Sequence, residues 1–224
     1  MALLAVGFDI DGTLYPDYKA HVRSVPFCVA NAKKVLAFAR TRRRMREESA
    51  LSEMLSDPSE AEVKIFAEES GLSRNEARKI RDELIYQTWE KSFRGMTPYS
   101  GVRQALLQLR QAGLKLAALS DFPVGKKLEY FHLADLFDVA TGFPESGGLK
   151  PRPEPFLVMA EKLGVAPSDI LYVGNKLDYD VYGAEGAGMR GALVGPPGRH
   201  APEGTLVYRD YQHLAESVLS EVVS

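Results

Sequence analysis

The chain has 224 residues, of which 45% are hydrophobic and 26% are charged, and its formal net charge is −2. This composition is typical of a globular protein with one good core, and it argues against a general nucleic-acid binder, which usually carries a strong basic excess. The single cysteine, Cys28, excludes an intrachain disulfide and a cysteine-rich zinc site. The N-terminal apolar run has no basic flank and is interrupted by Asp9, so we expect no signal peptide, no membrane span and a cytoplasmic protein.

The first predicted element is a buried strand over residues 3–10, LLAVGFDI, which is apolar and ends just before Gly12. From residue 15 to about residue 97 the apolar spacing becomes helical, and nothing in this stretch resembles a buried strand. It contains two candidate capping boxes, Ser59 with Glu62 and Ser73 with Glu76. We therefore expect an inserted helical domain at 15–97, with a core domain made of residues 1–14 and 98–224.

After a turn cluster at 97–101, predicted strands and helices alternate to the end of the chain. The further strands are expected at 114–120, 138–142, 169–174, 191–195 and 205–209. The helices are expected at 100–112, 124–131, 154–164, 180–188 and 211–223. Alternation of this kind with apolar strands predicts an α/β fold, in which helices cover both faces of a parallel sheet.

Polar residues suited to chemistry follow the ends of these strands. Asp9 and Asp11 follow the first strand, Ser120 ends the second, Lys150 lies in GGLKP, and GNKLDYD (174–180) follows the strand at 169–174. Each alone has an ordinary explanation as a turn, a helix cap or a surface lysine. Ligands of open α/β sheets bind at the carboxyl ends of the strands, so the set together indicates a functional site.

Read in order, DIDGT, LSD, GLKP and VGNKLDYDVYGA resemble the four motifs of the haloacid dehalogenase (HAD) superfamily. The resemblance covers the whole chain and implies a Rossmann-like core with a C1-type helical cap at 15–97. It implies a Mg²⁺-dependent phosphomonoester hydrolase that acts through an aspartyl-phosphate on a small phosphorylated metabolite or nucleotide. Dehalogenating members lack an acid at the position of Asp11, which therefore favours phosphate esters. A phosphomutase and a weakly active phosphoryl-ligand-binding protein remain alternatives, and the oligomeric state is open.

The expected chemistry begins at the two aspartates. Asp9 would be the nucleophile, since a carboxylate that attacks phosphorus divides one difficult displacement into two easier steps. Asp11 would protonate the leaving alkoxide and then activate water, while its backbone carbonyl joins the metal shell. Gly12 allows the sharp turn that follows, and Thr13 is expected to cap this substrate-binding loop. A Mg²⁺ ion would compensate the charge of an anion that attacks an anionic phosphate.

The later motifs complete the expected site. Ser120 would donate a hydrogen bond to a phosphate oxygen, helped by backbone N–H groups around Asp121. Lys150 would offset charge on the transferred phosphoryl group. Asn175 stands where most phosphatase members of the superfamily have an aspartate, and it is expected to ligate Mg²⁺ with Asp9, Asp11 and an acid from the same motif. Asp180 is favoured for that acid over Asp178, and the neutral Asn175 predicts weaker metal binding.

Three further expectations concern charges and aromatic residues. Asp121 would need a cation, for which Lys126 or Lys127 is available. The basic run at 40–48 is interpreted as a solvated helix face with i,i+4 charge pairs in preference to a phosphate contact. The apolar seam of the helical insert is expected to include Tyr86, Trp89 and Phe93, and a role for His21 and Arg23 near the substrate is the less favoured interpretation.

Overall fold

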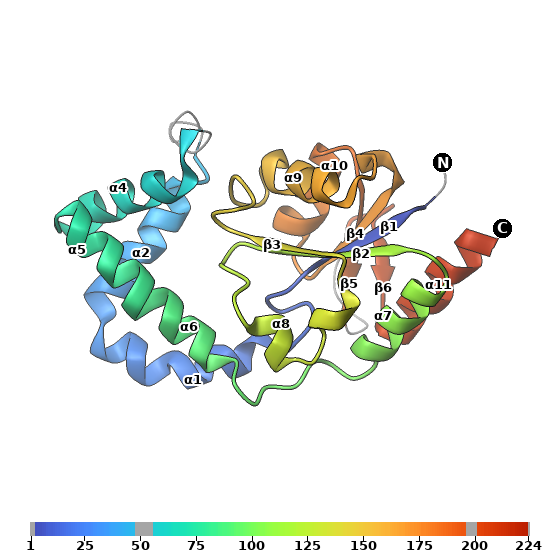
Figure 1. Ribbon diagram of the computed structural model, residues 1–224, viewed down its shortest axis with the longest axis horizontal. Coiled ribbons are helices and arrows are strands. Elements are labelled where there is room, and N and C mark those ends of the chain that lie inside the picture. The colour runs from blue at the N-terminus through green and yellow to red at the C-terminus, as the bar shows by residue number, and fades with distance from the viewer. Residues whose placement is uncertain (1–2, 48–55, 196–200, 224) are drawn as a thin grey trace.

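The computed structural model describes residues 3–47, 56–195 and 201–223 and centres on a parallel sheet (Figure 1). The sheet has six strands in the order β3-β2-β1-β4-β5-β6, and every neighbouring pair is parallel. Its strands are β1 (Ala5–Asp9), β2 (Lys115–Ser120), β3 (Val139–Gly142), β4 (Ile170–Gly174), β5 (Arg190–Val194) and β6 (Leu206–Tyr208). The predicted α/β fold is confirmed, and the central strand β1 delivers Asp9 to the carboxyl edge of the sheet.

Helices cover both faces of the sheet, as Figure 1 shows. Successive side chains of a strand point to opposite faces, so Val6 and Phe8 of β1 pack in the cluster that includes helices α7 (Val102–Gln111) and α11 (Tyr211–Val223). Ala5 belongs to the cluster on the other face, which includes α9 (Pro153–Leu163) and α10 (Tyr182–Gly186). A strand that is buried on both faces reads as a continuous apolar run, which explains the sequence LLAVGF.

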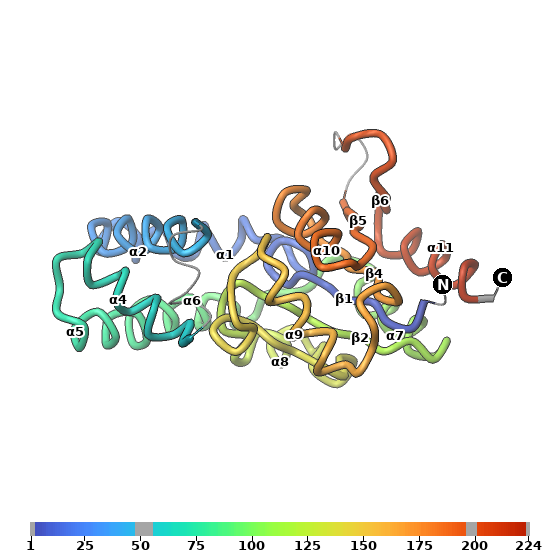
Figure 2. Tube along the Cα trace, turned by 90° about the horizontal axis from the view of Figure 1, so that it is seen from above, coloured from blue at the N-terminus to red at the C-terminus, as the bar shows by residue number. Residues whose placement is uncertain are grey.

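Between β1 and β2 the chain forms a helical insert. Its helices are α1 (Asp17–Ala30), α2 (Ala32–Arg44), α4 (Pro58–Ser70) and the run of α5 (Arg74–Lys79), η2 (Ile80–Tyr86) and α6 (Gln87–Ser92), in which η2 is π-helical. The insert has its own small core, which includes Ala37, Phe38, Val63, Phe66, Ala67, Ala77 and Ile85. Figure 2 shows the insert extending from one end of the sheet domain, with both chain termini at the opposite end.

One of the two predicted capping boxes in the insert is confirmed. Ser73 accepts from the backbone N–H of Glu76, whose side chain accepts from Ser73 in return. The box assigned to Ser59 is wrong, because α4 begins at Pro58 and its N-cap is Asp57, which accepts from the backbone of Glu60. Proline at the first helical position and aspartate at the N-cap are both favourable there.

The aromatic seam joins the insert to the sheet domain. Phe93 contacts Tyr15, with ring centroids 5.3 Å apart, and Trp89 lies 5.4 Å from Phe122 in the loop after β2. Tyr86 contacts Phe122 at 6.2 Å and also packs on Phe38 within the insert. Aromatic pairs at these distances add about 0.5–1.5 kcal/mol each beyond their burial, so the insert is held against the loop that follows Ser120.

The remaining elements are short. They are α8 (Lys127–Tyr130), η3 (Ala134–Leu136), η4 (Pro167–Asp169) and η5 (Leu177–Val181). The helix expected at 124–131 is therefore helical over its second half only, at Lys127–Tyr130. Within the described parts of the chain, no helix combines the length and apolar character that a bilayer-spanning segment requires.

Candidate active site

Asp9 lies at the end of the central strand, almost fully buried, and both of its carboxylate oxygens are held. Thr13 Oγ1 donates to Asp9 Oδ2 at 2.7 Å, and Lys150 Nζ donates to Asp9 Oδ1 at 2.6 Å. The chain turns back at Gly12, where φ is +91° and a Cβ would lie 2.2 Å from Asn175 Nδ2. Only glycine fits this combination of positive φ and close approach.

Lys150 connects the first motif to the last one. Its Nζ is buried and lies 2.6 Å from Asp180 Oδ1 as well as from Asp9. Asp180 Oδ2 accepts from the backbone N–H groups of Asn175 at 3.0 Å and Lys176 at 2.9 Å. The structure therefore brings Asp180 into the site, whereas Asp178, in the same short helix η5 (Leu177–Val181), is exposed.

Asp9 and Lys150 shift each other's pKa. Burial raises the pKa of Asp9 to about 7, with Lys150 opposing that shift and Asp180 and Asp11 adding to it. Burial disfavours the charged form of Lys150, yet the Asp180 and Asp9 carboxylates outweigh it and raise the lysine pKa well above its ordinary value. Lys150 is therefore a cation that favours ionised Asp9.

Asp11 is surrounded by donors. Its carboxylate accepts from Ser120 Oγ at 2.6 Å, from the Tyr15 hydroxyl at 2.6 Å and from Lys127 Nζ at 2.9 Å. Burial raises the pKa of Asp11, but the charge of Lys127 and these hydrogen bonds outweigh burial and lower the pKa below its usual value. The sequence did not single out Lys127 as a partner of Asp11, because no local pattern distinguishes it from the exposed Lys126.

The cation beside Asp121 comes from the insert, so the expectation of Lys126 or Lys127 is wrong. Arg46 Nη2 lies 2.7 Å from Asp121 Oδ2, while the backbone N–H of Lys150 donates to Asp121 Oδ1 at 2.9 Å. Arg42 donates to the Asp121 carbonyl oxygen. Arg42 lies in the last turn of α2 and Arg46 in the turn that follows this helix, and both reach Asp121 of the sheet domain.

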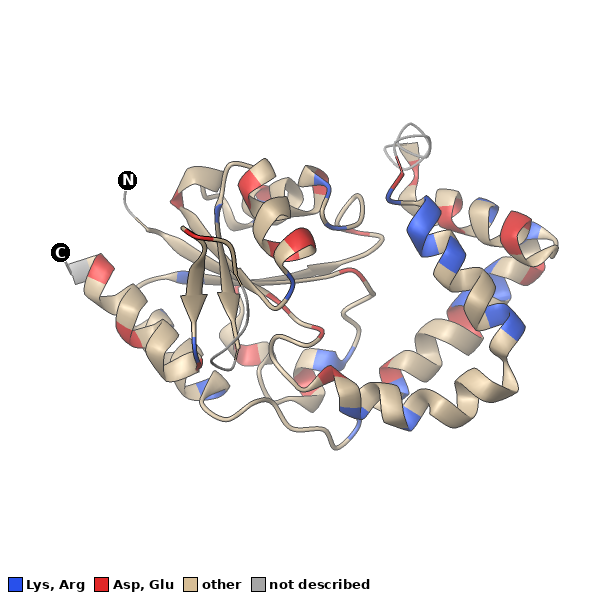
Figure 3. Ribbon diagram, turned by 180° about the vertical axis from the view of Figure 1, so that it is seen from behind, with Lys and Arg blue, Asp and Glu red and all other residues tan. Residues whose placement is uncertain are grey.

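The basic run thus has two faces, and its interpretation as a solvated face is only partly right. Figure 3 shows the Lys and Arg residues crowded along α2. Arg40 and Arg44 form the outer face, where they pair with Glu69 at 2.8 and 3.0 Å. These pairs connect α2 to α4 instead of linking residues four apart on one helix.

His21 and Arg23 do not reach the aspartates. His21 lies against Trp89 at 5.7 Å between ring centroids. Arg23 Nη1 donates to the backbone carbonyls of Ser92 and Arg94, which ties α1 to the end of the insert. Both residues are structural in this arrangement.

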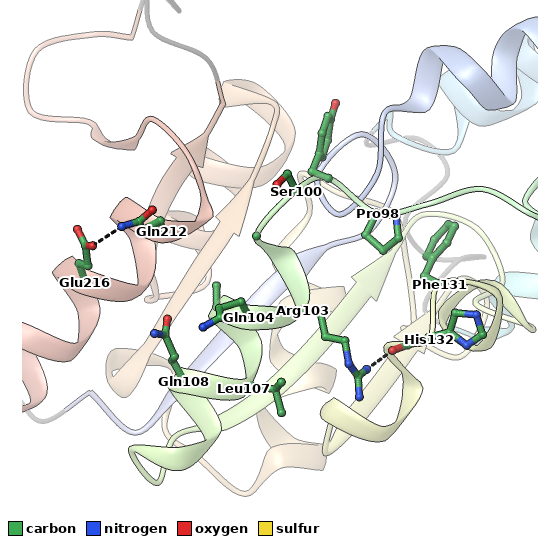
Figure 4. Close-up of a pocket in the computed structure, with 13 residues that line it drawn as sticks. Pro98, Ser100, Arg103, Gln104, Leu107, Gln108, Phe131, His132, Gln212 and Glu216 are labelled. Atoms are coloured by element: carbon green, nitrogen blue, oxygen red, sulfur yellow. Dashed lines mark hydrogen bonds between the residues drawn. The ribbon is translucent and has the colours of Figure 1, made fainter.

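A cavity of about 190 Å³ opens over the aspartates. It is lined by Asp9, Asp11, Arg46, Asp121, Phe122, Lys150, Asn175, Lys176, Tyr179 and Asp180. A larger surface groove of about 880 Å³ runs along α7, from Gln212 and Glu216 of α11 to Phe131 and His132 after α8 (Figure 4). Polar groups there satisfy each other, since Arg103 donates to the His132 carbonyl and Gln212 donates to Glu216, so the groove offers no comparable chemistry.

The carboxylate and amide oxygen atoms around the smaller cavity are ligands that suit a hard divalent cation. Among the described residues no cluster of three or more His, Cys, Asp or Glu side chains is arranged for a metal, so amide and backbone oxygens would have to contribute. Asn175 Oδ1 is buried and has no hydrogen-bond partner among them. A buried carbonyl oxygen without a partner is costly, and a cation would satisfy it.

Comparison with known proteins agrees with this geometry. The family model for haloacid dehalogenase-like hydrolases matches residues 3–188. The chain belongs to the haloacid dehalogenase-like hydrolase family. This HAD-like chain is 30% identical over 197 residues to glyceraldehyde 3-phosphate phosphatase of Methanopyrus kandleri, which covers 83% of the chain and 81% of the relative. It is 28% identical over 210 residues to phosphoglycolate phosphatase of Escherichia coli, covering 82% of the chain and 77% of the relative.

Solved HAD structures share the architecture. A HAD phosphatase from Thermococcus onnurineus superposes with a TM-score of 0.66 at 25% identity, covering 96% of this chain and 97% of that one. A 2-haloacid dehalogenase from Pseudomonas syringae gives the same TM-score at 23% identity, covering 98% and 99%, which shows the common fold alone. The helical insert between β1 and β2 is thus a feature of the HAD fold.

Proposed function

We propose that the protein is a Mg²⁺-dependent phosphomonoester hydrolase with Asp9 as its nucleophile. The observation that carries the proposal is the pair Asp9 and Asp11 at one cavity, with Lys150 2.6 Å from the first carboxylate and Ser120 2.6 Å from the second. Hydrolysis of a phosphate ester requires an acid to protonate the leaving oxygen, and Asp11 can be that acid. Cleavage of a carbon–halogen bond requires no such acid. The phosphatase names of the relatives support the same chemistry.

The reaction divides into two displacements. An Asp9 oxygen attacks phosphorus, the ester P–O bond breaks, and Asp11 gives its proton to the leaving oxygen. Asp11 then takes a proton from a water molecule, whose oxygen attacks the phosphorus of the aspartyl-phosphate and releases Asp9 and inorganic phosphate. Asp11 is ionised in the resting structure, so it must gain its proton when substrate places a second anion beside it.

The other residues orient these groups. Thr13 and Lys150 hold the two oxygens of Asp9, and the Ser120 hydroxyl is placed to donate to a phosphate oxygen once Asp11 releases it. Asp180 keeps Lys150 and the backbone of the 175–176 turn in place.

Magnesium would be held by Asp9, the backbone carbonyl of Asp11 and Asn175, with Asp180 as the nearest further acid. When bound, it would compensate the combined negative charge of the nucleophile and the phosphate. Asp180 already accepts three hydrogen bonds from protein donors. One negative charge is absent because position 175 is an asparagine, so we expect the metal to bind weakly.

The helical insert, residues 15–97, would act as a cap over a core of 1–14 and 98–224. Arg42 and Arg46 reach from the insert to Asp121, and the aromatic seam supports the same contact. A cap that closes over the cavity excludes water while the aspartyl-phosphate forms. The cavity of about 190 Å³ favours small phosphorylated metabolites.

The decisive experiment compares Asp9→Asn with the wild type in release of phosphate from 4-nitrophenyl phosphate with and without Mg²⁺. We expect Mg²⁺-dependent release in the wild type and none above background in the variant, because an amide is not a nucleophile toward phosphorus. Asp178→Asn is the matched control, since Asp178 is an exposed acid at the same edge of the sheet. Undiminished turnover in Asp9→Asn would rule out the mechanism.

A further inference from the structure

The lining of the cavity includes two cations that the proposed phosphoryl chemistry does not use. Arg46 and Lys176 both line the cavity, and both lie against the ring of Tyr179. The Arg46 guanidinium carbon is 5.0 Å from the ring centroid and Lys176 Nζ is 5.7 Å from it. Within the described part of the insert, Arg46 is the one residue that lines this cavity.

Arg46 is fixed before any ligand arrives. Its Nη2 donates to Asp121 at 2.7 Å, its Nε donates to the Lys150 carbonyl at 2.8 Å and its Nη1 donates to the Arg42 carbonyl at 2.9 Å. An arginine carries five N–H donors, so two remain for a ligand. A planar guanidinium held in this way loses little conformational entropy when it binds an anion.

Lys176 adds a second positive charge with more freedom. Its backbone N–H is held by Asp180, but its side chain is exposed and forms no ion pair with the residues that the structure describes. Lys150, Lys127 and Ser120 are engaged with Asp9 and Asp11, so they serve the phosphoryl end. The cations beside Tyr179 are therefore placed for the part of the substrate that leaves.

We infer, building on the function proposed above, that Arg46 and Lys176 bind a negative charge on the leaving group. The preferred substrates are then small phosphomonoesters whose leaving group itself carries an anion, a carboxylate or a second phosphate. Substrates with an uncharged leaving group lack this interaction. A hydrogen bond to a charged group contributes about 1.5–3 kcal/mol, which corresponds to about 10- to 150-fold in kcat/KM.

The two named relatives act on substrates that differ in this feature, which supplies a test. The leaving group of phosphoglycolate carries a carboxylate, whereas that of glyceraldehyde 3-phosphate is uncharged. We expect the wild type to prefer phosphoglycolate in kcat/KM by about tenfold or more. Propane-1,3-diol bisphosphate forms a third arm, and a preference for it over phosphoglycolate would identify the anion as a second phosphate.

Four variants separate the binding role from general effects. In Arg46→Ala the ratio of kcat/KM for phosphoglycolate to that for glyceraldehyde 3-phosphate should fall about 10- to 100-fold, and Arg46→Lys should recover part of it. Lys176→Met should lower the ratio about three- to tenfold, and because this side chain is exposed the variant should fold normally. Lys126→Met removes an exposed charge outside the cavity and should leave the ratio unchanged.

The ratio of kcat/KM for phosphoglycolate to that for glyceraldehyde 3-phosphate tests the inference even if removal of Arg46 lowers kcat/KM for every substrate. An unchanged ratio in both Arg46→Ala and Lys176→Met would overturn it, as would a wild type that prefers the uncharged leaving group. Absence of phosphate release from all of these substrates and from 4-nitrophenyl phosphate would instead refute the proposed phosphatase function.

Discussion

Glu62 is the residue on which we expect the stability of the insert to depend most strongly. It is fully buried, its carboxylate lies 2.7 Å from Arg42 and it accepts from the Tyr86 hydroxyl at 2.5 Å. Arg81 adds a second positive charge 3.6 Å away. The substitution Glu62→Gln keeps the shape of the side chain, removes its charge and leaves the buried Arg42 guanidinium without a counterion.

The size of the effect follows from this geometry. Opposite charges 2.7 Å apart attract by about 6 kcal/mol at an effective dielectric constant of about 20. Desolvation of both groups offsets part of that attraction, and breaking a buried pair costs about 3–5 kcal/mol. Glutamine can still accept one hydrogen bond, so we expect the free energy of unfolding to fall by about 3 kcal/mol.

The assay is urea unfolding followed by the fluorescence of Trp89, the single tryptophan, which lies in the insert. Glu69→Gln is the matched control on the same helix, since Glu69 also pairs with arginines but at the surface, where such pairs contribute about 0–1 kcal/mol. A loss of less than about 1 kcal/mol in Glu62→Gln, equal to that of the control, would refute the reasoning.

Three further predictions concern the site. Lys127→Met removes the cation that lowers the pKa of Asp11, so Asp11 should hold its proton to higher pH, and the alkaline limb of the pH profile of kcat/KM should move to higher pH for alkyl phosphates, whose leaving group needs a proton, and much less for 4-nitrophenyl phosphate; an unmoved limb would contradict a role for Lys127 in setting the protonation of Asp11. Asn175→Asp restores a carboxylate, and calorimetric titration should show Mg²⁺ binding about tenfold tighter than in the wild type; unchanged affinity would place the metal elsewhere. Asp180→Ala should weaken Mg²⁺ binding in the same titration more than Asp178→Ala does, and equal affinities would remove the distinction between the two acids.

The strand ends were predictable because parallel strands present their carboxyl ends at one edge. That rule predicts Asp9, Asp11, Ser120 and the 174–180 segment at one edge of the sheet, and the structure places Asp180 beside Lys150 and leaves Asp178 exposed. The α/β fold followed from the alternation of apolar strands with helices. These features depend on local pattern and on one topological rule.

The contributions of Arg46 and Lys127 were not predictable in the same way, since each depends on a contact between distant parts of the chain. Lys127 reaches Asp11 across 116 positions, and nothing in its neighbourhood marks it. Arg42 and Arg46 did leave a signal, because a spacing of four places them on one helical face and separates them from Arg40 and Arg44. That spacing predicts that Arg42 and Arg46 point in the same direction, but it does not identify the residues that they contact.

The pairing of Asp121 with Arg46 has a consequence for substrates that are too large. In the proposed mechanism, a bulky leaving group that holds the insert away from the sheet domain also separates Arg46 from Asp121, which lie 2.7 Å apart in this structure. Asp121 then keeps its negative charge next to the position of the phosphate and repels it. In the proposed mechanism we therefore expect oversized esters to be disfavoured twice, by steric exclusion and by the Asp121 carboxylate, which loses its Arg46 partner when the insert is held away.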